Sequence, residues 1–262
     1  MKFVRLATIV ALSSTLFAGG ITAFADETRQ VTTNGNIEFT PSTDEPEIVV
    51  PPENEPDVDI EPEVPGTTGP LSILKATTMN FGSQVISNQD QTYNMIAERQ
   101  QKTGTTGEEN KVPYISFAQV SDTRGSNAGW DLKVSLSDFR SKNTQNSVLR
   151  GAEITLKDPQ IQYSGNNQEL APAAHENNLK LMPNSGAVSV MTAESKKGAG
   201  RSSVVWGKQA DLNAQFEADP SATVTNNAIQ LSVPGASAKD ATTYTSTLTW
   251  ELTTTPGSNV GA

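Results

Sequence analysis

The stretch Gly129-Trp130-Asp131-Leu132-Lys133-Val134-Ser135-Leu136 decides how this chain is expected to fold. Its apolar residues recur at every second position, which is the period of a β-strand with one buried face. Trp130 and Leu132 therefore share one face, while Asp131 points to the other. The same order of residues returns near the carboxyl end in Leu248-Thr249-Trp250-Glu251-Leu252-Thr253, so the chain has two strands of one design.

Period-two alternation runs through most of the chain after Gly69-Pro70. It predicts further strands around residues 71–73, 114–120, 154–156 and 229–233, separated by turn-forming residues such as those at 122–127, 164–167 and 234–237. Only the short stretch 93–102 has a helical pattern. Many short strands joined by turns are typical of an all-β protein.

The expected architecture is an antiparallel β-sandwich, an immunoglobulin-like Greek key with loop insertions. The segment 240–246 supports this expectation, because Tyr244 resembles the tyrosine corner that opens a late strand of such domains. The position two residues further on, where those domains have a cysteine, is Ser246, so the match is partial.

The first 25 residues predict a signal peptide. Lys2 and Arg5 precede an apolar run, and the small-x-small pattern Ala23-Phe24-Ala25 predicts cleavage between Ala25 and Asp26. The protein is therefore expected to be secreted. No later apolar run is long enough for a membrane span, so none is expected in the mature form.

The mature chain divides by composition into three parts. Residues 26–40 are expected to form an N-terminal strand, because β-branched and aromatic residues surround an Asn-Gly turn signal. Residues 41–69 predict an acidic, proline-rich loop or linker: positions 41–65 hold nine acidic residues, seven prolines and no base. Residues 70–262 are expected to be the main body of the β-sandwich.

Composition excludes several classes of function. The absence of cysteine excludes disulfides, thiol nucleophiles, cysteine-ligated metals and a lipid-modified cysteine. His175 is the single histidine, which excludes a two-histidine metal site, and its polar surroundings predict a surface loop. Without residues 1–25 the chain has 17 basic and 29 acidic side chains, a net charge of −12 that disfavours nucleic acid as a partner. We predict no catalytic residues, no metal and no cofactor.

Four weaker signals have simpler interpretations. Ser72-Ile73-Leu74-Lys75 matches the Ser-x-x-Lys motif of penicillin-recognising enzymes, but that chemistry needs a helical turn and this stretch is strand-like. The acids Asp122, Asp131, Asp211 and Glu251 have no spacing that favours a glycosidase, and the loop 122–127 is a solvated turn more readily than a calcium site. Lys196, Lys197 and Arg201 form a basic cluster in a Gly-rich loop, which favours a solvated flexible loop over contact with anionic wall polymers.

Two interpretations of the paired tryptophans are open at this point. Trp130 and Trp250 are core anchors if their faces, which continue with leucine and valine, are buried. They form a platform for sugar rings if those faces are exposed, with Asp131 and Glu251 beside the sugar. Trp206, after two valines, is assigned to the core.

Paired Trp-x-Leu motifs, one in mid-chain and one at the carboxyl end, resemble the WxL-domain cell-surface proteins of Gram-positive bacteria. Further segments similar to that family are Gly69–Ile73, Asn80–Ser83, Gln119–Gly125, Leu149–Leu156 and Leu231–Gly235, and the likeness extends over residues 26–256. The resemblance implies non-covalent attachment to the cell wall through peptidoglycan, and co-assembly with other surface proteins.

The function expected from the sequence is therefore that of a non-enzymatic, secreted surface protein that binds peptidoglycan or another wall polymer. The candidate binding residues are Trp130, Asp131, Leu132, Trp250, Glu251 and Leu252. The alternative is a protein–protein or adhesion module, held at the surface by a partner surface protein or binding a host matrix protein.

Overall fold

The computed structural model describes residues 30–42, 47–142 and 144–254. The predicted signal peptide and its cleavage site at Ala25 and Asp26 lie outside these residues. The chain separates into two units, Met1–Glu38 and Phe39–Ala262. Residues 30–42 contain no helix or strand and are all exposed, so the strand predicted for residues 26–40 is not formed in its described part.

The second unit is all-β, and its described strands form four small antiparallel sheets, each named here after one of its strands. The β7 sheet has the order β10(Ala173–Ala174), β12(Val188–Ala193), β7(Trp130–Leu136), β15(Leu248–Thr253). The β6 sheet has the order β2(Leu71–Lys75), β6(Ser116–Asp122), β13(Gly200–Trp206), β9(Pro159–Tyr163). The β14 sheet has the order β11(Leu179–Leu181), β8(Glu153–Leu156), β14(Thr225–Val233), β3(Gln91–Ile96). The β4 sheet has the order β1(Val58–Asp59), β4(Glu98–Lys102), β5(Lys111–Tyr114).

This arrangement corrects the expected architecture. The prediction of an immunoglobulin-like Greek-key sandwich is wrong, because the strands divide among four small antiparallel sheets, comparable in number to the blades of a four-bladed β-propeller. Each four-stranded sheet takes its strands from distant parts of the chain. Alternation predicts that a strand has one buried face, but it does not say which strands pair, and here the long-range pairing decides the fold.

The stretch with a helical pattern, residues 93–102, is also corrected. It forms parts of β3 and β4, in which Tyr93, Met95 and Ala97 follow the period of a strand. Met95 enters one hydrophobic core and Ala97 the next, so the chain crosses between two cores at this point. The only α-helix among the described residues is α1(Gln209–Ala218), and single 3₁₀ turns occur at Glu108–Asn110 and Gln168–Leu170.

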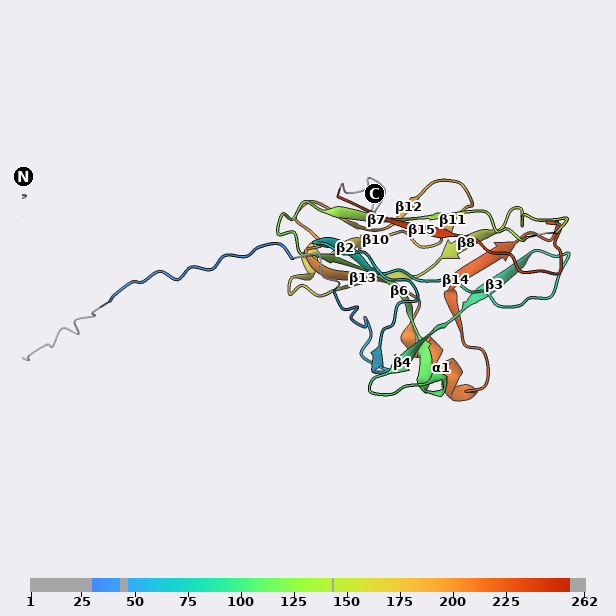
Figure 1. The fold of residues 1–262 in the computed structure, drawn as a ribbon, viewed down its shortest axis with the longest axis horizontal. Coiled ribbons are helices and arrows are strands. Elements are labelled where there is room, and N and C mark those ends of the chain that lie inside the picture. Colours follow the sequence, from blue (N-terminus) through green and yellow to red (C-terminus); the bar gives the residue numbers. More distant parts are fainter. Residues whose placement is uncertain (1–29, 43–46, 143, 255–262) are drawn as a thin grey trace, which may run out of the picture. The chain divides into compact units, whose positions relative to one another are not determined.

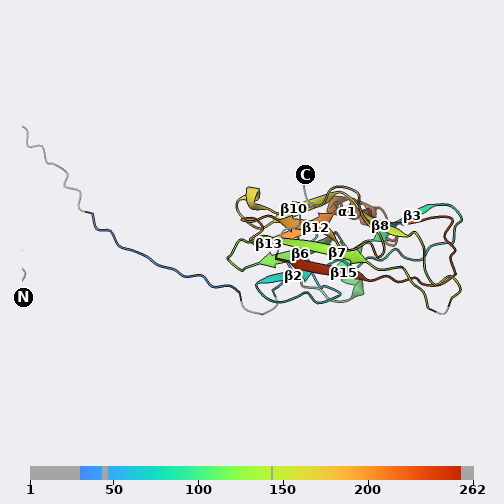
Figure 2. The ribbon, with the colours of Figure 1, turned by 90° about the horizontal axis from the view of Figure 1, so that it is seen from above.

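Two hydrophobic cores stabilise the second unit. The main core lies among the β7, β6 and β14 sheets, and the second core lies among the β6 sheet, the β4 sheet and α1. Figure 1 shows the β7 sheet in one layer, the β6 sheet in the next, and β4 with α1 on its far side. Figure 2 shows the same unit from above, with the paired strands β7 and β15 side by side. Every residue of β6 is buried, because Phe117 enters the second core and its neighbour Ala118 the main core. The expectation of half-buried strands therefore fails for β6.

The acidic, proline-rich segment is not a solvated linker along its length. Val58 is buried in the second core, and β1 pairs with β4. The amide and carbonyl of Glu53 both bind the hydroxyl of Tyr114, at 2.9 and 2.7 Å. The backbone of Val50 binds the side-chain amide of Gln119 through both its N–H and its C=O. The carboxylates of Glu47 and Glu53 add hydrogen bonds from Ser121 and Gln162. Residues 47–65, called the strap below, are therefore docked, while most of their other acidic residues are exposed.

Tyr114→Phe is expected to loosen the strap. The substitution leaves both the N–H and the C=O of Glu53 without their partner, which costs about 1–3 kcal/mol of unfolding free energy. Chemical denaturation measures the loss, and faster proteolysis within residues 47–65 locates it. Tyr93→Phe is the matched control, because the Tyr93 hydroxyl has no hydrogen-bond partner among the described residues; an equal loss in both variants would contradict the prediction.

Candidate functional site

The two Trp-x-Leu strands lie side by side. β7 pairs with β15 in an unbroken antiparallel register that sets Leu132 opposite Leu252 and Val134 opposite Trp250. The motifs, distant in sequence, are therefore one structural feature at the edge of the β7 sheet. The sequence predicted both strands but not their pairing.

The indole of Trp130 belongs to the core. Its ring is fully buried, and its Nε1–H donates to the carbonyl of Gly198 at 3.0 Å. Gly198 has a φ of +73°, and a Cβ there would lie 2.8 Å from Trp130 Nε1, so this close approach requires glycine. Trp250 is half-buried on the edge strand and lies 6.2 Å from the ring of Trp206. The interpretation of the tryptophans as core anchors is confirmed for Trp130 and for the fully buried Trp206.

His175 completes this cluster, and the prediction that it lies on a surface loop is wrong. It is 5% exposed, because its ring packs against Trp206. The indole Nε1–H of Trp206 donates to His175 Nε2 at 2.8 Å, so His175 Nδ1 carries the proton and donates to the Glu176 carbonyl. Burial lowers the pKa of His175 below its ordinary value of 6.5.

The acids of the two motifs lie on the opposite face of the β7 sheet. The carboxylate of Asp131 is completely enclosed, accepting hydrogen bonds from Ser189 and Thr192 at 2.8 Å and lying 3.3 Å from the ammonium of Lys133. Glu251 is exposed and lies opposite Lys133. Among the predicted binding residues, Trp130, Asp131 and Leu132 are inaccessible, whereas Trp250, Leu252 and Glu251 retain exposed surface.

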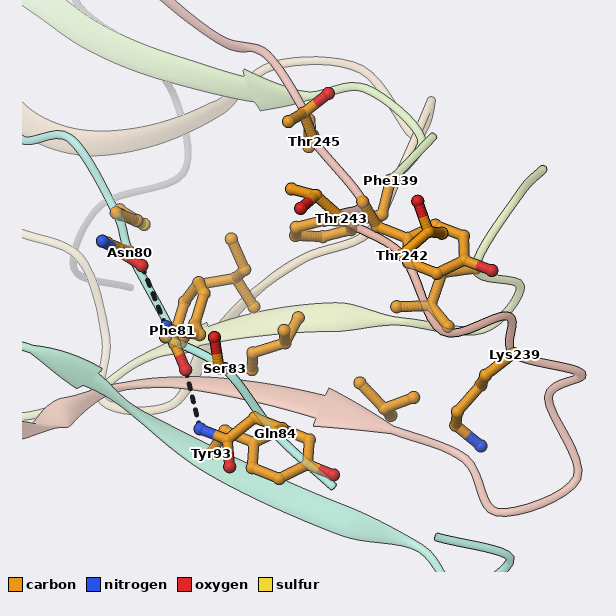
Figure 3. A pocket seen from close by; sticks show the side chains of 18 of the residues that line it. Asn80, Phe81, Ser83, Gln84, Tyr93, Phe139, Lys239, Thr242, Thr243 and Thr245 are labelled. Atoms are coloured by element: carbon orange, nitrogen blue, oxygen red, sulfur yellow. Dashed lines mark hydrogen bonds between the residues drawn. The ribbon is translucent and has the colours of Figure 1, made fainter. Parts of the chain in front are cut away.

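A cleft of about 870 Å³ opens where β7 ends and β15 begins (Figure 3). Its floor is apolar and consists of Leu136, Phe139, Leu149, Ile154, Leu231, Val233 and Leu248. Residues 79–86 form one wall and residues 239–246 the other. Leu136 and Leu248 place the cleft directly at the ends of the two Trp-x-Leu strands.

The first wall combines aromatic and amide groups. Asn80 Oδ1 accepts the N–H of Gly82 at 2.9 Å, and Gln84 Nε2 donates to the carbonyl of Phe81 at 2.7 Å. Gly82 has a φ of +69°, which this tight turn requires. Two large apolar side chains at the rim, Val85 and Ile86, are exposed.

The second wall is rich in hydroxyl groups, from Thr242, Thr243 and Thr245. Tyr244 holds it in place: its hydroxyl donates to the carbonyl of Asn146 and accepts the N–H of Asp240. Tyr244 thus makes the backbone contacts of a tyrosine corner, although the predicted Greek key is absent. The N–H and side-chain amide of Asn146 hold the pKa of Asp240 below its ordinary range.

Lys239 links the two walls. Its ammonium donates to the carbonyls of Ser87, Pro234, Gly235 and Ser237. No carboxylate forms an ion pair with Lys239 among the described residues, but the carboxylate of Asp240 belongs to the same lining, so this end of the cleft has one charge of each sign. An apolar floor, hydroxyl and amide rims and these two charges suit a ligand with methyl, hydroxyl, amide and charged groups.

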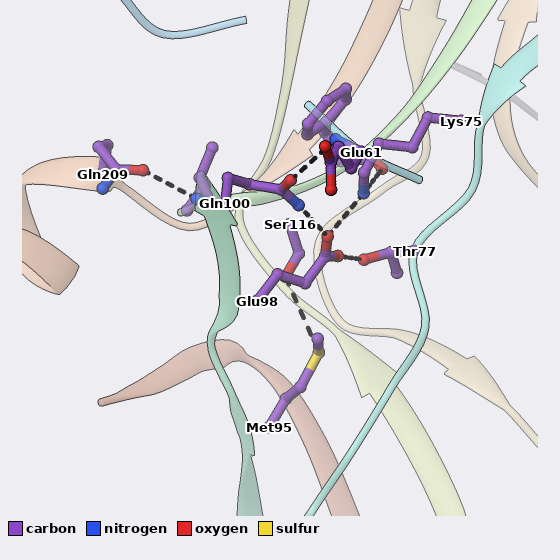
Figure 4. Close-up of polar contacts among 10 residues, drawn as sticks. Glu61, Lys75, Thr77, Met95, Glu98, Gln100, Ser116 and Gln209 are labelled. Carbon is purple, nitrogen blue, oxygen red and sulfur yellow. Dashed lines mark hydrogen bonds and ion pairs between the residues drawn. The ribbon is translucent and has the colours of Figure 1, made fainter. Parts of the chain in front are cut away.

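Lys75 has a structural environment rather than a catalytic one (Figure 4). Its ammonium lies 2.7 Å from Glu98 Oε2 and 4.4 Å from the ring centre of Phe117. Thr77 and Gln100 donate to the same carboxylate. Since Ser72 and Lys75 lie on a strand, the residues do not have the helical geometry that the Ser-x-x-Lys chemistry needs.

The remaining candidate sites have ordinary structural partners. Asp122, in the loop weighed as a calcium site, binds Arg124 through both carboxylate oxygens. Lys197 of the basic cluster pairs with Glu194. Within the described ranges no group of three or more metal-ligating side chains occurs, and no helix is long and apolar enough to cross a membrane.

These observations define a class: an all-β protein with an open cleft at the edge of its main core. The chain belongs to the WxL family, described as a surface cell wall-binding domain, whose sequence model matches residues 26–256. The protein is therefore a cell-surface protein associated with the cell wall. No curated protein and no solved structure matches it significantly.

The cleft was not predicted from the sequence. Its walls are irregular segments that alternation does not describe, and the strands that form its floor are distant in the chain. Tyr244 was the one residue that indicated part of the cleft in advance, because the expected tyrosine corner placed a fixed loop beside the strand of the second motif.

Trp130→Ala is expected to destabilise the protein by about 3–5 kcal/mol, the usual cost of truncating a buried tryptophan. Trp250→Ala is expected to cost less, because its ring is half-buried on an edge strand. Urea denaturation of both variants measures the difference. Equal losses would show that the two indoles contribute alike.

Acidification is expected to weaken the core through His175. The native state holds its imidazole neutral, so the unfolded state binds a proton more readily as the pH falls below 6.5. The contribution of neutral His175 to the free energy of unfolding is fully present above that pH. Below it, this contribution falls by up to about 1.4 kcal/mol per pH unit, until the lowered native pKa is reached. Urea titrations from pH 7.5 to 5 measure the slope. His175→Gln, which keeps an acceptor for Trp206, is expected to flatten it, and an unchanged slope would assign the loss to other groups.

Proposed function

We propose that this protein is a non-enzymatic, secreted surface protein that binds peptidoglycan directly and non-covalently through the cleft. The cleft carries the proposal: it is a preformed apolar hollow of about 870 Å³ with hydroxyl and amide groups along both walls. Membership of a cell wall-binding family supports a wall polymer as the ligand.

The chemistry of peptidoglycan matches the three kinds of surface in the cleft. Sugar faces and lactyl or acetamido methyl groups pack on apolar and aromatic surface such as Phe139 and Tyr93. Sugar hydroxyls and stem-peptide amides hydrogen-bond with groups such as Thr243 and Asn80. Stem-peptide carboxylates are attracted by the ammonium of Lys239. Many copies bound to a repeating polymer offset a modest affinity at each site.

In this proposal the Trp-x-Leu motifs contribute to binding mainly by holding the segments that form the cleft in place. Trp130, Asp131 and Leu132 are enclosed and hold the two strands in register, while Leu136 and Leu248 at the strand ends form the cleft floor. Direct contact from the motifs is restricted to Trp250, Glu251 and Leu252, which retain exposed surface.

Filling the cleft is expected to abolish wall binding. The test is co-sedimentation of residues 26–262 with sacculi freed of protein and of attached anionic polymers. Thr243→Trp places a large ring at an exposed cleft position and is expected to weaken pelleting about tenfold or more, equivalent to about 1.4 kcal/mol of lost contact. Thr249→Trp is the matched control, because Thr249 is exposed on the outer face of β15.

The outcomes separate the alternatives. Loss of pelleting only with Thr249→Trp would move the site to the outer face beside Glu251. A wild-type chain that stays in the supernatant would overturn direct binding and favour attachment through a partner surface protein. Release of soluble wall fragments would overturn the non-enzymatic assignment.

A further inference from the structure

Residues 31–40, called the arm below, are exposed throughout although their sequence favours a strand. Val31, Ile37 and Phe39 are 89%, 78% and 85% exposed. They lie at odd positions, so a strand would present them together on one face, with Glu38 on the other. If the arm formed a strand, these side chains would make one apolar face, and an apolar face of that kind favours contact with another surface. The family match begins at residue 26, so the arm belongs to the shared domain.

The edge strand β15 offers the complementary surface. Within the described residues β15 pairs only with β7. The N–H of Ser137 donates to the carbonyl of Thr247, and the N–H of Thr247 donates to Ser137 Oγ, so the backbone groups of Thr247 face the strand of β7. By alternation from Thr247, the backbone groups of Leu248, Trp250 and Leu252 point away from β7, toward the edge. The side chains of the same three residues are half-buried against the main core.

Other edge strands are better protected. Thr67 N–H donates to the carbonyl of Ile73 in β2, and the N–H of Ile96 in β3 donates to Asn80. β9 begins with a proline, which blunts a sheet edge. β15 has no proline, lysine or bulge, and its register with β7 is unbroken. It is therefore more open to an added strand than β2, β3 or β9.

We propose that the arm of one molecule adds as a strand to β15 of a second copy of this chain. Backbone hydrogen bonds to the edge would supply part of the affinity, as in other β-strand additions, and Ile37 and Phe39 would cover the half-buried face of Trp250 and Leu252. A second copy is favoured over the molecule's own arm because the connecting sequence, residues 41–46, contains Pro41, Pro46 and two adjacent acids. Prolines and adjacent like charges favour an extended chain, so the sequence of this short connector favours exchange between copies over folding back.

The first measurement is sedimentation velocity of residues 26–262 over a range of concentrations. The wild-type chain is expected to shift from monomer to dimer or larger species as its concentration rises. The double substitution Ile37→Asp and Phe39→Asp is expected to stay monomeric, whereas Val64→Asp, at a 68% exposed position of the strap, is the matched control and is expected to behave as the wild type. A monomeric wild type, or oligomers that survive the double substitution, would overturn the proposal.

The second measurement identifies the edge and distinguishes the two origins of the arm. Because the chain has no cysteine, single substitutions give site-specific disulfides under mild oxidation with diamide. Chains with Glu38→Cys, mixed with chains carrying Thr249→Cys or Glu251→Cys, are expected to form a cross-linked heterodimer, and Glu217→Cys on α1 is the control that is expected not to. If these pairs fail while the oligomer persists, the assignment to β15 is wrong. If a doubly substituted chain closes only on itself, the occupant is its own arm, and exchange between copies is overturned.

Discussion

The buried indole N–H groups of the main core are the constraint on which the rest of the structure depends. An unpaired N–H in a dry core is costly, so each needs an acceptor at a fixed place. Trp130 uses the carbonyl of Gly198, which fixes the loop after β12, and Trp206 uses His175, which fixes the segment after β10. The pairing of β15 with β7 then sets Trp250 beside Trp206 and closes the core. The Trp-x-Leu motif is thus first a device for folding.

Sequence periodicity predicted individual strands well because it reports a local property. β7 begins and ends at the residues that alternation indicated, and β2, β8, β14 and β15 occur where they were expected. The Greek key was wrong because sheet membership depends on contacts between distant segments, such as β8 between β11 and β14. The stretch 93–102 failed for a related reason: its polar residues hide the inward positions of Met95 and Ala97, which face two different cores.

The candidate site was harder to predict than the fold, because polarity in the sequence does not report burial. His175 precedes the polar residues Glu176 and Asn177 yet is enclosed, and Asp131 lies on the outer face of its sheet yet is inaccessible. The strap has the composition of a linker, but its residue Val58 is buried in the second core and the backbone of Glu53 binds the hydroxyl of Tyr114. The cleft has no local signature, since its walls acquire their shape from Tyr244 and Lys239, which bind the backbone of other segments.

The architecture separates stability from recognition. Trp130, Trp206, His175 and the enclosed acid of the first motif are removed from solvent, so they fix the strands without offering groups to a ligand. The accessible groups lie at the limits of those same strands: the cleft at the ends of β7 and β15, the outward backbone of β15, and the arm. Because the two strands are rigid, they fix the positions of the loops that begin at their ends. Binding residues of other proteins often lie on loops held by such a fixed scaffold. A motif whose first tryptophan is fully buried can therefore still determine the shape of the cleft that we propose as the wall-binding site.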